Sequence, residues 1–102
     1  MKMTALHQIL SDNLTAFREC VSVVSTGDSI FFVGAGVQLF STPNSIIEML
    51  QATKSGIKLF ASEQDLSVAE LQEKAGQLDV MALDDAQWVG LLNTHLQVLS
   101  WK

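Results

Sequence analysis

Apolar residues in this chain fall into two kinds of pattern that alternate along it. The apolar and aromatic run at 29–33 (Ser-Ile-Phe-Phe-Val) is typical of a strand buried on both faces of a parallel sheet, and the segment 57–61 (Ile-Lys-Leu-Phe-Ala) is expected to be the next strand. Segment 14–24 instead repeats its apolar side chains at helical spacing, with Leu14, Phe17, Val21 and Val24. Strands that alternate with helices predict an α/β fold with a mostly parallel sheet and helices on both of its faces.

Further apolar segments predict the remaining strands. We expect strands at 4–10 and 78–83, and the run 37–40 offers a short additional one. No repeat, low-complexity tract or Pro/Gly-rich linker interrupts the chain. We therefore expect one domain over residues 1–102, with about five strands.

Four helix starts are marked by their capping residues. Asp12 or Asn13 can cap the first helix, and Thr42-Pro43 opens the second with proline at its first position. Two pairs match the capping box, in which residues three apart bond to each other's backbone N–H: Ser67 with Glu70, and Asp84 with Gln87. They predict helices at about 68–75 and 85–96.

The composition indicates a domain that works inside an assembly. Apolar residues make up 48% of the chain and charged residues only 17%, against roughly 25% charged in typical soluble domains. A small domain cannot bury all of its apolar side chains, and contiguous apolar surface usually marks an interface. Oligomerisation is therefore expected.

The charge distribution disfavours direct binding of nucleic acid or of an anionic membrane. The formal net charge is −5, and the six basic residues do not cluster as phosphate contacts require: Lys2, Arg18, Lys54, Lys58, Lys74 and Lys102. No run approaches the ~18 apolar residues of a membrane span, and the first ten residues are too polar for a signal peptide. With a single cysteine, which cannot form an internal disulfide, these features favour the cytoplasm.

Cys20 is the only cysteine and the one obvious residue for covalent sulfur chemistry, because a thiolate can act as nucleophile or carry a persulfide. At roughly 100° per residue, it lies at the flank of the apolar stripe of its helix, which predicts partial burial. Cys20 lies past the middle of its helix, so the positive N-terminus of that helix does not lower the pKa of its thiol. The adjacent Glu19 carries a negative charge, which also does not favour a thiolate. A packed small apolar residue and a persulfide carrier both remain open.

Other candidate sites have simpler structural explanations. His7 and His95 lie at opposite ends of the chain, and neither forms a sequence pattern with Cys20 that is typical of a catalytic triad. No Cys/His pair is close enough in sequence for a structural zinc site. His7 is therefore expected to be a hydrogen-bonded positioning residue. Gly34-Ala35-Gly36 lacks the third glycine of a dinucleotide loop and the lysine of a P-loop, which favours a tight turn with positive φ. Asp84-Asp85 is explained by helix capping. No metal or cofactor is expected.

The two tryptophans are candidate interface residues. Trp88 is expected to pack at the last helix. Trp101 lies in the terminal segment Val-Leu-Ser-Trp, where a bulky aromatic must dock either on the domain itself or on a partner. Because interfaces are enriched in tryptophan, both alternatives stay open for Trp101.

An ordered set of short motifs resembles the DsrH/TusB family of small sulfur-relay proteins. The set runs through Leu6-His7, Gly27-Asp28, 30–33, Gly36-Val37, 57–61, Asp65-Leu66, Trp88-Val89 and Leu99-Ser100-Trp101. The chain departs from the family pattern at Ala35, where an aspartate is usual, at 68–70, where an arginine-glycine pair is usual, and near Asp84-Asp85, where a tyrosine is frequent. It resembles a divergent member.

The resemblance implies a three-layer α/β/α domain that assembles with two related small subunits into a hetero-hexamer. In the TusBCD branch such a complex passes persulfide sulfur toward 2-thiolation of the wobble uridine in tRNA; in the DsrEFH branch it serves sulfur oxidation. The principal sulfur-carrying cysteine belongs to a different subunit, although DsrH-like chains carry one in the first helix, where Cys20 lies.

Three hypotheses follow from the residues and the resemblance together. The leading one is a non-catalytic or accessory subunit of a cytoplasmic complex on the tRNA thiolation side. The second is a DsrH-like subunit in which Cys20 holds a persulfide. The third is a self-associating interaction module with no sulfur transfer.

Overall fold

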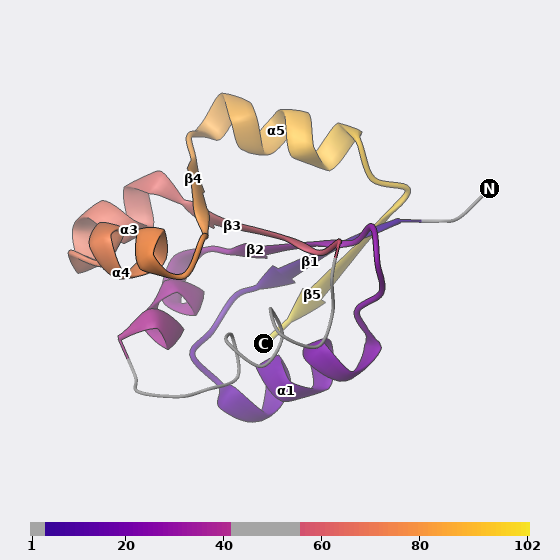
Figure 1. Cartoon of the computed structure of the whole chain (residues 1–102), viewed down its shortest axis with the longest axis horizontal. Coiled ribbons are helices and arrows are strands. Elements are labelled where there is room, and N and C mark those ends of the chain that lie inside the picture. The colour runs from indigo at the N-terminus through magenta and orange to yellow at the C-terminus, as the bar shows by residue number, and fades with distance from the viewer. Residues whose placement is uncertain (1–3, 42–55) are drawn as a thin grey trace.

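The computed structural model describes residues 4–41 and 56–102 and contains one sheet of five parallel strands. The strand order is β4-β3-β2-β1-β5 (Figure 1). The strands are β1 (Ala5–Ile9), β2 (Ser29–Phe32), β3 (Lys58–Ser62), β4 (Met81–Leu83) and β5 (Gln97–Trp101). The predicted α/β fold is confirmed. The helix expected from Thr42-Pro43 onward lies outside the described residues.

Helices cover both faces of the sheet. α1 (Leu14–Val23) lies on one face and α5 (Asp85–Asn93) on the other, as Figure 1 shows. β2 is buried along its whole length, as its apolar run predicts, and it sends Ile30 and Phe32 to the α1 side and Phe31 to the α5 side. The three-layer arrangement therefore follows from a strand that is apolar on both faces.

The first and last helices begin where the sequence predicts. Asn13 caps α1, since its side chain accepts the backbone N–H groups of Thr15 and Ala16. Asp84 and Gln87 form the expected capping box at α5. Both starts are set by local hydrogen bonds between neighbouring residues, which is why they can be recognised in the sequence.

The capping box predicted at Ser67 and Glu70 is wrong. The chain forms two short helices here, α3 (Glu63–Ala69) and α4 (Gln72–Gln77), instead of one helix at 68–75. Ser62 is the N-cap of α3 and accepts the N–H of Asp65 at 3.3 Å, whereas Glu70 ends α3 in the left-handed conformation. The pattern Ser-x-x-Asp at 62–65, directly after β3, is the signal that governs this start.

This correction can be tested with two matched serine variants. Ser62→Ala is expected to lower the unfolding free energy by about 1 kcal/mol, because it removes the acceptor for an N-terminal N–H of α3. Ser67→Ala, inside the same helix, is expected to change it by less than about 0.5 kcal/mol. Urea unfolding of both variants measures the difference. A larger loss for Ser67→Ala would restore the original assignment.

The expected short strand at 37–40 is also wrong: η1 (Gly34–Phe40) is a 3₁₀ helix. Gly34 adopts φ +59 and donates its N–H to the Asp65 carboxylate at 2.7 Å, which turns the chain sharply after β2. The predicted tight turn with positive φ is confirmed. Because Val37, Leu39 and Phe40 all enter the core below the sheet, a compact helix buries them without a further strand.

The fifth strand is β5, for which the sequence analysis predicted no element. β5 pairs in parallel with β1 from Ala5↔Gln97 to Ile9↔Trp101. The expected final helix, 85–96, ends earlier, at Asn93, and leaves room for this strand. The strand expected at 78–83 is confined to its last three residues.

Candidate functional site

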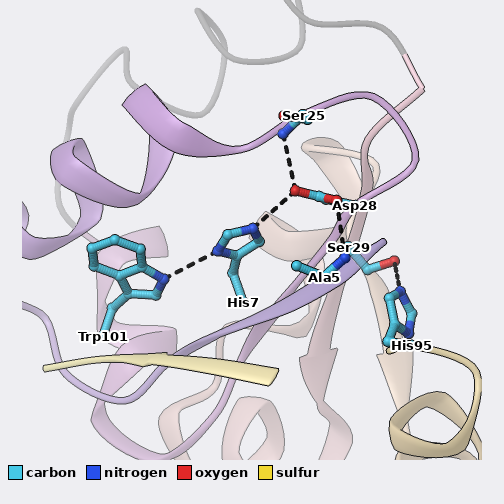
Figure 2. A network of polar contacts seen from close by, with 7 residues as sticks. All are labelled: Ala5, His7, Ser25, Asp28, Ser29, His95 and Trp101. Carbon is cyan, nitrogen blue, oxygen red and sulfur yellow. Dashed lines mark hydrogen bonds and ion pairs between the residues drawn. The ribbon is translucent and has the colours of Figure 1, made fainter. Parts of the chain in front are cut away.

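A buried polar cluster lies where the amino-terminal half of β1 meets the start of β2 (Figure 2). Asp28, 5% exposed, directly precedes β2, and His7, 1% exposed, lies in β1. One carboxylate oxygen, Oδ1, accepts the backbone N–H of Ala5 at 3.0 Å. The other, Oδ2, accepts the backbone N–H of Ser25 and the Nε2–H of His7, each at 3.0 Å. Asp28 thus joins β1, β2 and the turn that follows α1.

Trp101 completes this cluster from β5. Its indole Nε1 lies 3.2 Å from Nδ1 of His7, and the two rings stack with centroids 6.1 Å apart (Figure 2). Indole N–H only donates, so Nδ1 of His7 must accept, and the ring proton must be on Nε2, facing Asp28. The contacts therefore specify a neutral His7 in a single tautomer.

The second histidine ties the same end of β2 to the segment before β5. His95 donates from Nδ1 to the carbonyl oxygen of Leu91 at 2.9 Å, and its Nε2 is hydrogen-bonded to the Ser29 hydroxyl at 3.0 Å. Asp28 and Ser29 are adjacent, so each histidine is held by one of two successive residues (Figure 2).

The chemistry of this cluster is structural positioning. Both ring nitrogens of His7 are engaged, its side chain is buried, and no ring lone pair faces solvent. The expectation that His7 is a hydrogen-bonded positioning residue is confirmed. Neither imidazole offers a ring nitrogen to Cys20, since those of His95 are also engaged.

The pKa of Asp28 is shifted in a direction that stabilises the fold. Burial by itself raises the pKa of the Asp28 carboxyl, but the hydrogen bonds from Ser25, Ala5 and His7 outweigh it and hold the pKa below its usual value. The carboxylate therefore stays ionised in the folded protein at pH values where an ordinary aspartate takes up a proton.

This shift predicts a loss of stability in acid. The folded pKa of Asp28 is depressed, so below the ordinary value of about 4 the unfolded chain binds a proton that the folded chain does not. The contribution of Asp28 is present above that pH and falls as pH drops through the folded pKa. Urea midpoints measured from pH about 6 to about 3 should decline more steeply for the wild-type chain than for Asp28→Asn. Parallel declines would contradict the assignment.

Cys20 is more deeply buried than the sequence analysis expected. It lies in α1, past the middle of that helix as expected, but its exposed fraction is 0% instead of partial. Phe17, Cys20 and Val24 are spaced three and four residues apart, so they share one helix face, and that face packs in the core. A sulfur donor outside the folded protein cannot contact this thiol unless the structure around it opens.

The two tryptophans are both anchored to the domain itself. Trp101 contacts His7 as described, and Trp88 of α5 stacks on Phe31 with centroids 5.8 Å apart. The Trp88 indole N–H is buried, and none of the described residues accepts it. Whether a partner also contacts either ring stays a prediction.

The surface near α5 is acidic and suits no anionic ligand. A hollow between α3 and the start of α5 is lined in part by Glu63, Asp84 and Asp85. The glycine loop that follows β2 does not offer its first N–H to a phosphate either, because Gly34 donates that N–H to the Asp65 carboxylate.

Within residues 4–41 and 56–102, no three His, Cys, Asp or Glu side chains gather so as to hold a metal ion. No helix in these residues is long and apolar enough to cross a membrane.

Comparison with known proteins now identifies the family. A family model described as DsrH like protein matches residues 11–98, which is most of the chain. The chain belongs to the DsrH family. A comparison with curated proteins finds no match. Membership in the DsrH family supports a general role in sulfur relay, and proteins of this family work with partner subunits.

The polar cluster of this DsrH-family chain was not recognised in the sequence. His7 and Trp101 lie just outside the residues that the DsrH model matches, whereas Asp28 lies within them. His7 is 21 positions from Asp28 and 94 from Trp101, so no local spacing connects the three. The one available signal is Asp28 itself, an acidic residue directly before a fully buried strand, where it must find buried donors.

Proposed function

We propose that this chain is an accessory subunit of a cytoplasmic, TusBCD-like sulfur-relay complex that passes persulfide sulfur toward 2-thiouridine synthesis at the tRNA wobble position. In such a relay an attacking thiolate takes the outer sulfur of a donor persulfide and releases the donor as a thiolate. The observation that carries the accessory role is the zero exposure of Cys20, the only cysteine of the chain. A partner subunit then supplies the reacting thiol.

The negative charge of the chain also supports an accessory role without tRNA contact. The formal net charge of −5 and the acidic hollow beside α5 repel a polyanion such as tRNA. A protein that grasps tRNA needs clustered lysine and arginine side chains to neutralise phosphates. We assign tRNA contact to other members of the relay.

The exposed apolar side chains support the proposal that this chain assembles with related small α/β subunits. The proposed assembly is a hetero-hexamer. Large apolar residues more than 40% exposed occur on both helices and strands: Val23, Val68, Met81, Val89, Leu96 and Val98. None of the nine residues of α5 is buried, although the helix contains Trp88, Val89, Leu91 and Leu92. Apolar surface of this kind is usually covered by partners.

Two measurements test the proposal. A tagged chain expressed in its native cells should co-purify with two small α/β subunits, and deletion of its gene should deplete 2-thiouridine in tRNA, as measured by mass spectrometry of nucleosides. Complementation with Cys20→Ala should restore the modification as well as the wild-type gene does. Normal 2-thiouridine after deletion, with partners still captured, would support the interaction module without sulfur transfer instead.

The second candidate is a DsrH-like subunit of sulfur oxidation in which Cys20 carries a persulfide. The presence of Cys20 in α1, the position where DsrH-like chains carry a cysteine, favours it. Incubation of the purified chain with a cysteine desulfurase and cysteine would then add the mass of one sulfur atom. The gain should be absent from Cys20→Ser. A wild-type chain that gains no sulfur removes this candidate.

A further inference from the structure

Within the described residues, the strand β5 forms an edge of the sheet, and its own sequence carries none of the usual protective features. It pairs with β1 on one side and ends the strand order on the other. Edge strands are normally guarded by a charged residue, a proline, a bulge or extreme shortness. β5 has five residues, Gln-Val-Leu-Ser-Trp, with no charge and no proline, and its register with β1 is continuous.

The hydrogen-bonding groups on the open side of β5 can be assigned. The carbonyl oxygen of Trp101 accepts the N–H of Leu10 at 3.0 Å, so Trp101 directs its backbone groups toward β1. Backbone direction alternates along a strand in a parallel ladder, so Leu99 also faces β1, while Val98 and Ser100 face outward. The open edge therefore presents two N–H and two C=O groups from Val98 and Ser100.

Charge distinguishes this edge from the opposite one. β4, at the other edge, has three residues and is flanked by Asp79 and Asp84, which would repel a second copy of an acidic chain. β5 itself carries no ionisable side chain and is followed directly by the basic Lys102; Leu96 before it and Val98 within it are 70% and 43% exposed. Of the two edges, β5 is the one where two copies of a chain of net charge −5 meet without like-charge repulsion.

We propose that two copies of this chain pair through β5, antiparallel about a two-fold axis at Leu99. Val98 of each copy then exchanges both backbone hydrogen bonds with Ser100 of the other, giving four bonds across the interface. The axis is perpendicular to the sheet, so each face continues into the same face of the second copy. The result is one ten-stranded sheet with no open β5 edge. This pairing is independent of the sulfur-relay proposal.

The mass of the purified chain tests the pairing directly. Light scattering on the wild-type chain alone should give twice the 11.1 kDa of one chain. Val98→Pro removes an outward N–H without touching the β1 ladder, an edge position where proline is tolerated, and should give the mass of one chain. Val98→Thr keeps that N–H and β-branching and should remain a dimer. A monomeric wild-type chain, or a dimeric Val98→Pro, overturns the proposal.

A second pair of variants covers the case in which Val98→Pro fails to fold. Val98→Lys places a charge on the exposed side chain at the edge and should give monomers, whereas Val68→Lys, at the 80% exposed position on α3, should leave the dimer intact. Hydrogen exchange adds a readout of the bonds themselves. The amides of Val98 and Ser100 should be protected in concentrated wild-type protein and lose protection on dilution. Concentration-independent exchange at both amides would contradict the pairing, even if partner subunits co-purify with the chain.

Discussion

The Asp28→Ala variant is expected to lose about 3–5 kcal/mol of unfolding free energy, a large share of the 5–15 kcal/mol that stabilises a typical domain. The substitution leaves the N–H groups of Ala5 and Ser25 and the Nε2–H of His7 without their acceptor in a buried site. Unsatisfied buried donors keep the full cost of their desolvation. Urea unfolding followed by circular dichroism measures the loss.

The matched control for this prediction is Glu19→Ala, which removes an exposed carboxylate from α1. Its unfolding free energy should change by less than about 0.5 kcal/mol. Asp28→Asn should fall between the two, because the amide keeps one acceptor oxygen but presents an NH₂ group to donors. Equal stability of Asp28→Ala and Glu19→Ala would show that the polar cluster does not hold the fold.

The Gly36→Ala variant is expected to lose about 3 kcal/mol or more of unfolding free energy. A Cβ at Gly36 would lie 2.0 Å from the carbonyl oxygen of Ile9, a backbone atom that cannot turn aside as a flexible side chain would. That oxygen also accepts the N–H of Val33 at 3.1 Å, so moving it breaks the contact between β1 and the end of β2. Thermal and urea unfolding should both report the loss.

Gly90→Ala is the control for Gly36→Ala. Apart from its chain neighbours and the backbone of its own helix, no atom lies within 4 Å of a Cβ built at Gly90 in α5. Alanine there should raise stability by about 0.5–1 kcal/mol through its better helix propensity. The two substitutions are chemically identical and should have opposite signs. A similar effect at both positions would mean that η1 does not approach β1 as closely as the structure places it.

The parts of the fold that the sequence predicted are those specified by neighbours along the chain. β1, β2 and β3 were visible as apolar runs, and Asn13 and Asp84 as caps, because three or four consecutive residues decide each. The start of α3 was misassigned because Ser62 and Ser67 both begin plausible capping patterns. The strand β3 ends at Ser62, and only this tertiary boundary selects between them.

The features that the sequence analysis missed depend on contacts between distant residues. β5 has no distinctive local pattern and is a strand because it borders β1. The cluster of His7, Asp28 and Trp101 exists only once β1, β2 and β5 lie side by side. Cys20 was placed near the right helix face, but its complete burial depends on what packs over α1, which helical spacing does not contain.

The position of β1 between β2 and β5 has a consequence for how the chain is made. Gln8 in β1 and Ser100 in β5 are 92 positions apart, so a ribosome adding roughly 5–20 residues per second needs on the order of 5–20 s to synthesise the second after the first. During that interval β1 can pair with β2 but has no neighbour on its other side. The nascent chain thus carries a buried-type strand with one side exposed, a substrate suited to ribosome-associated chaperones.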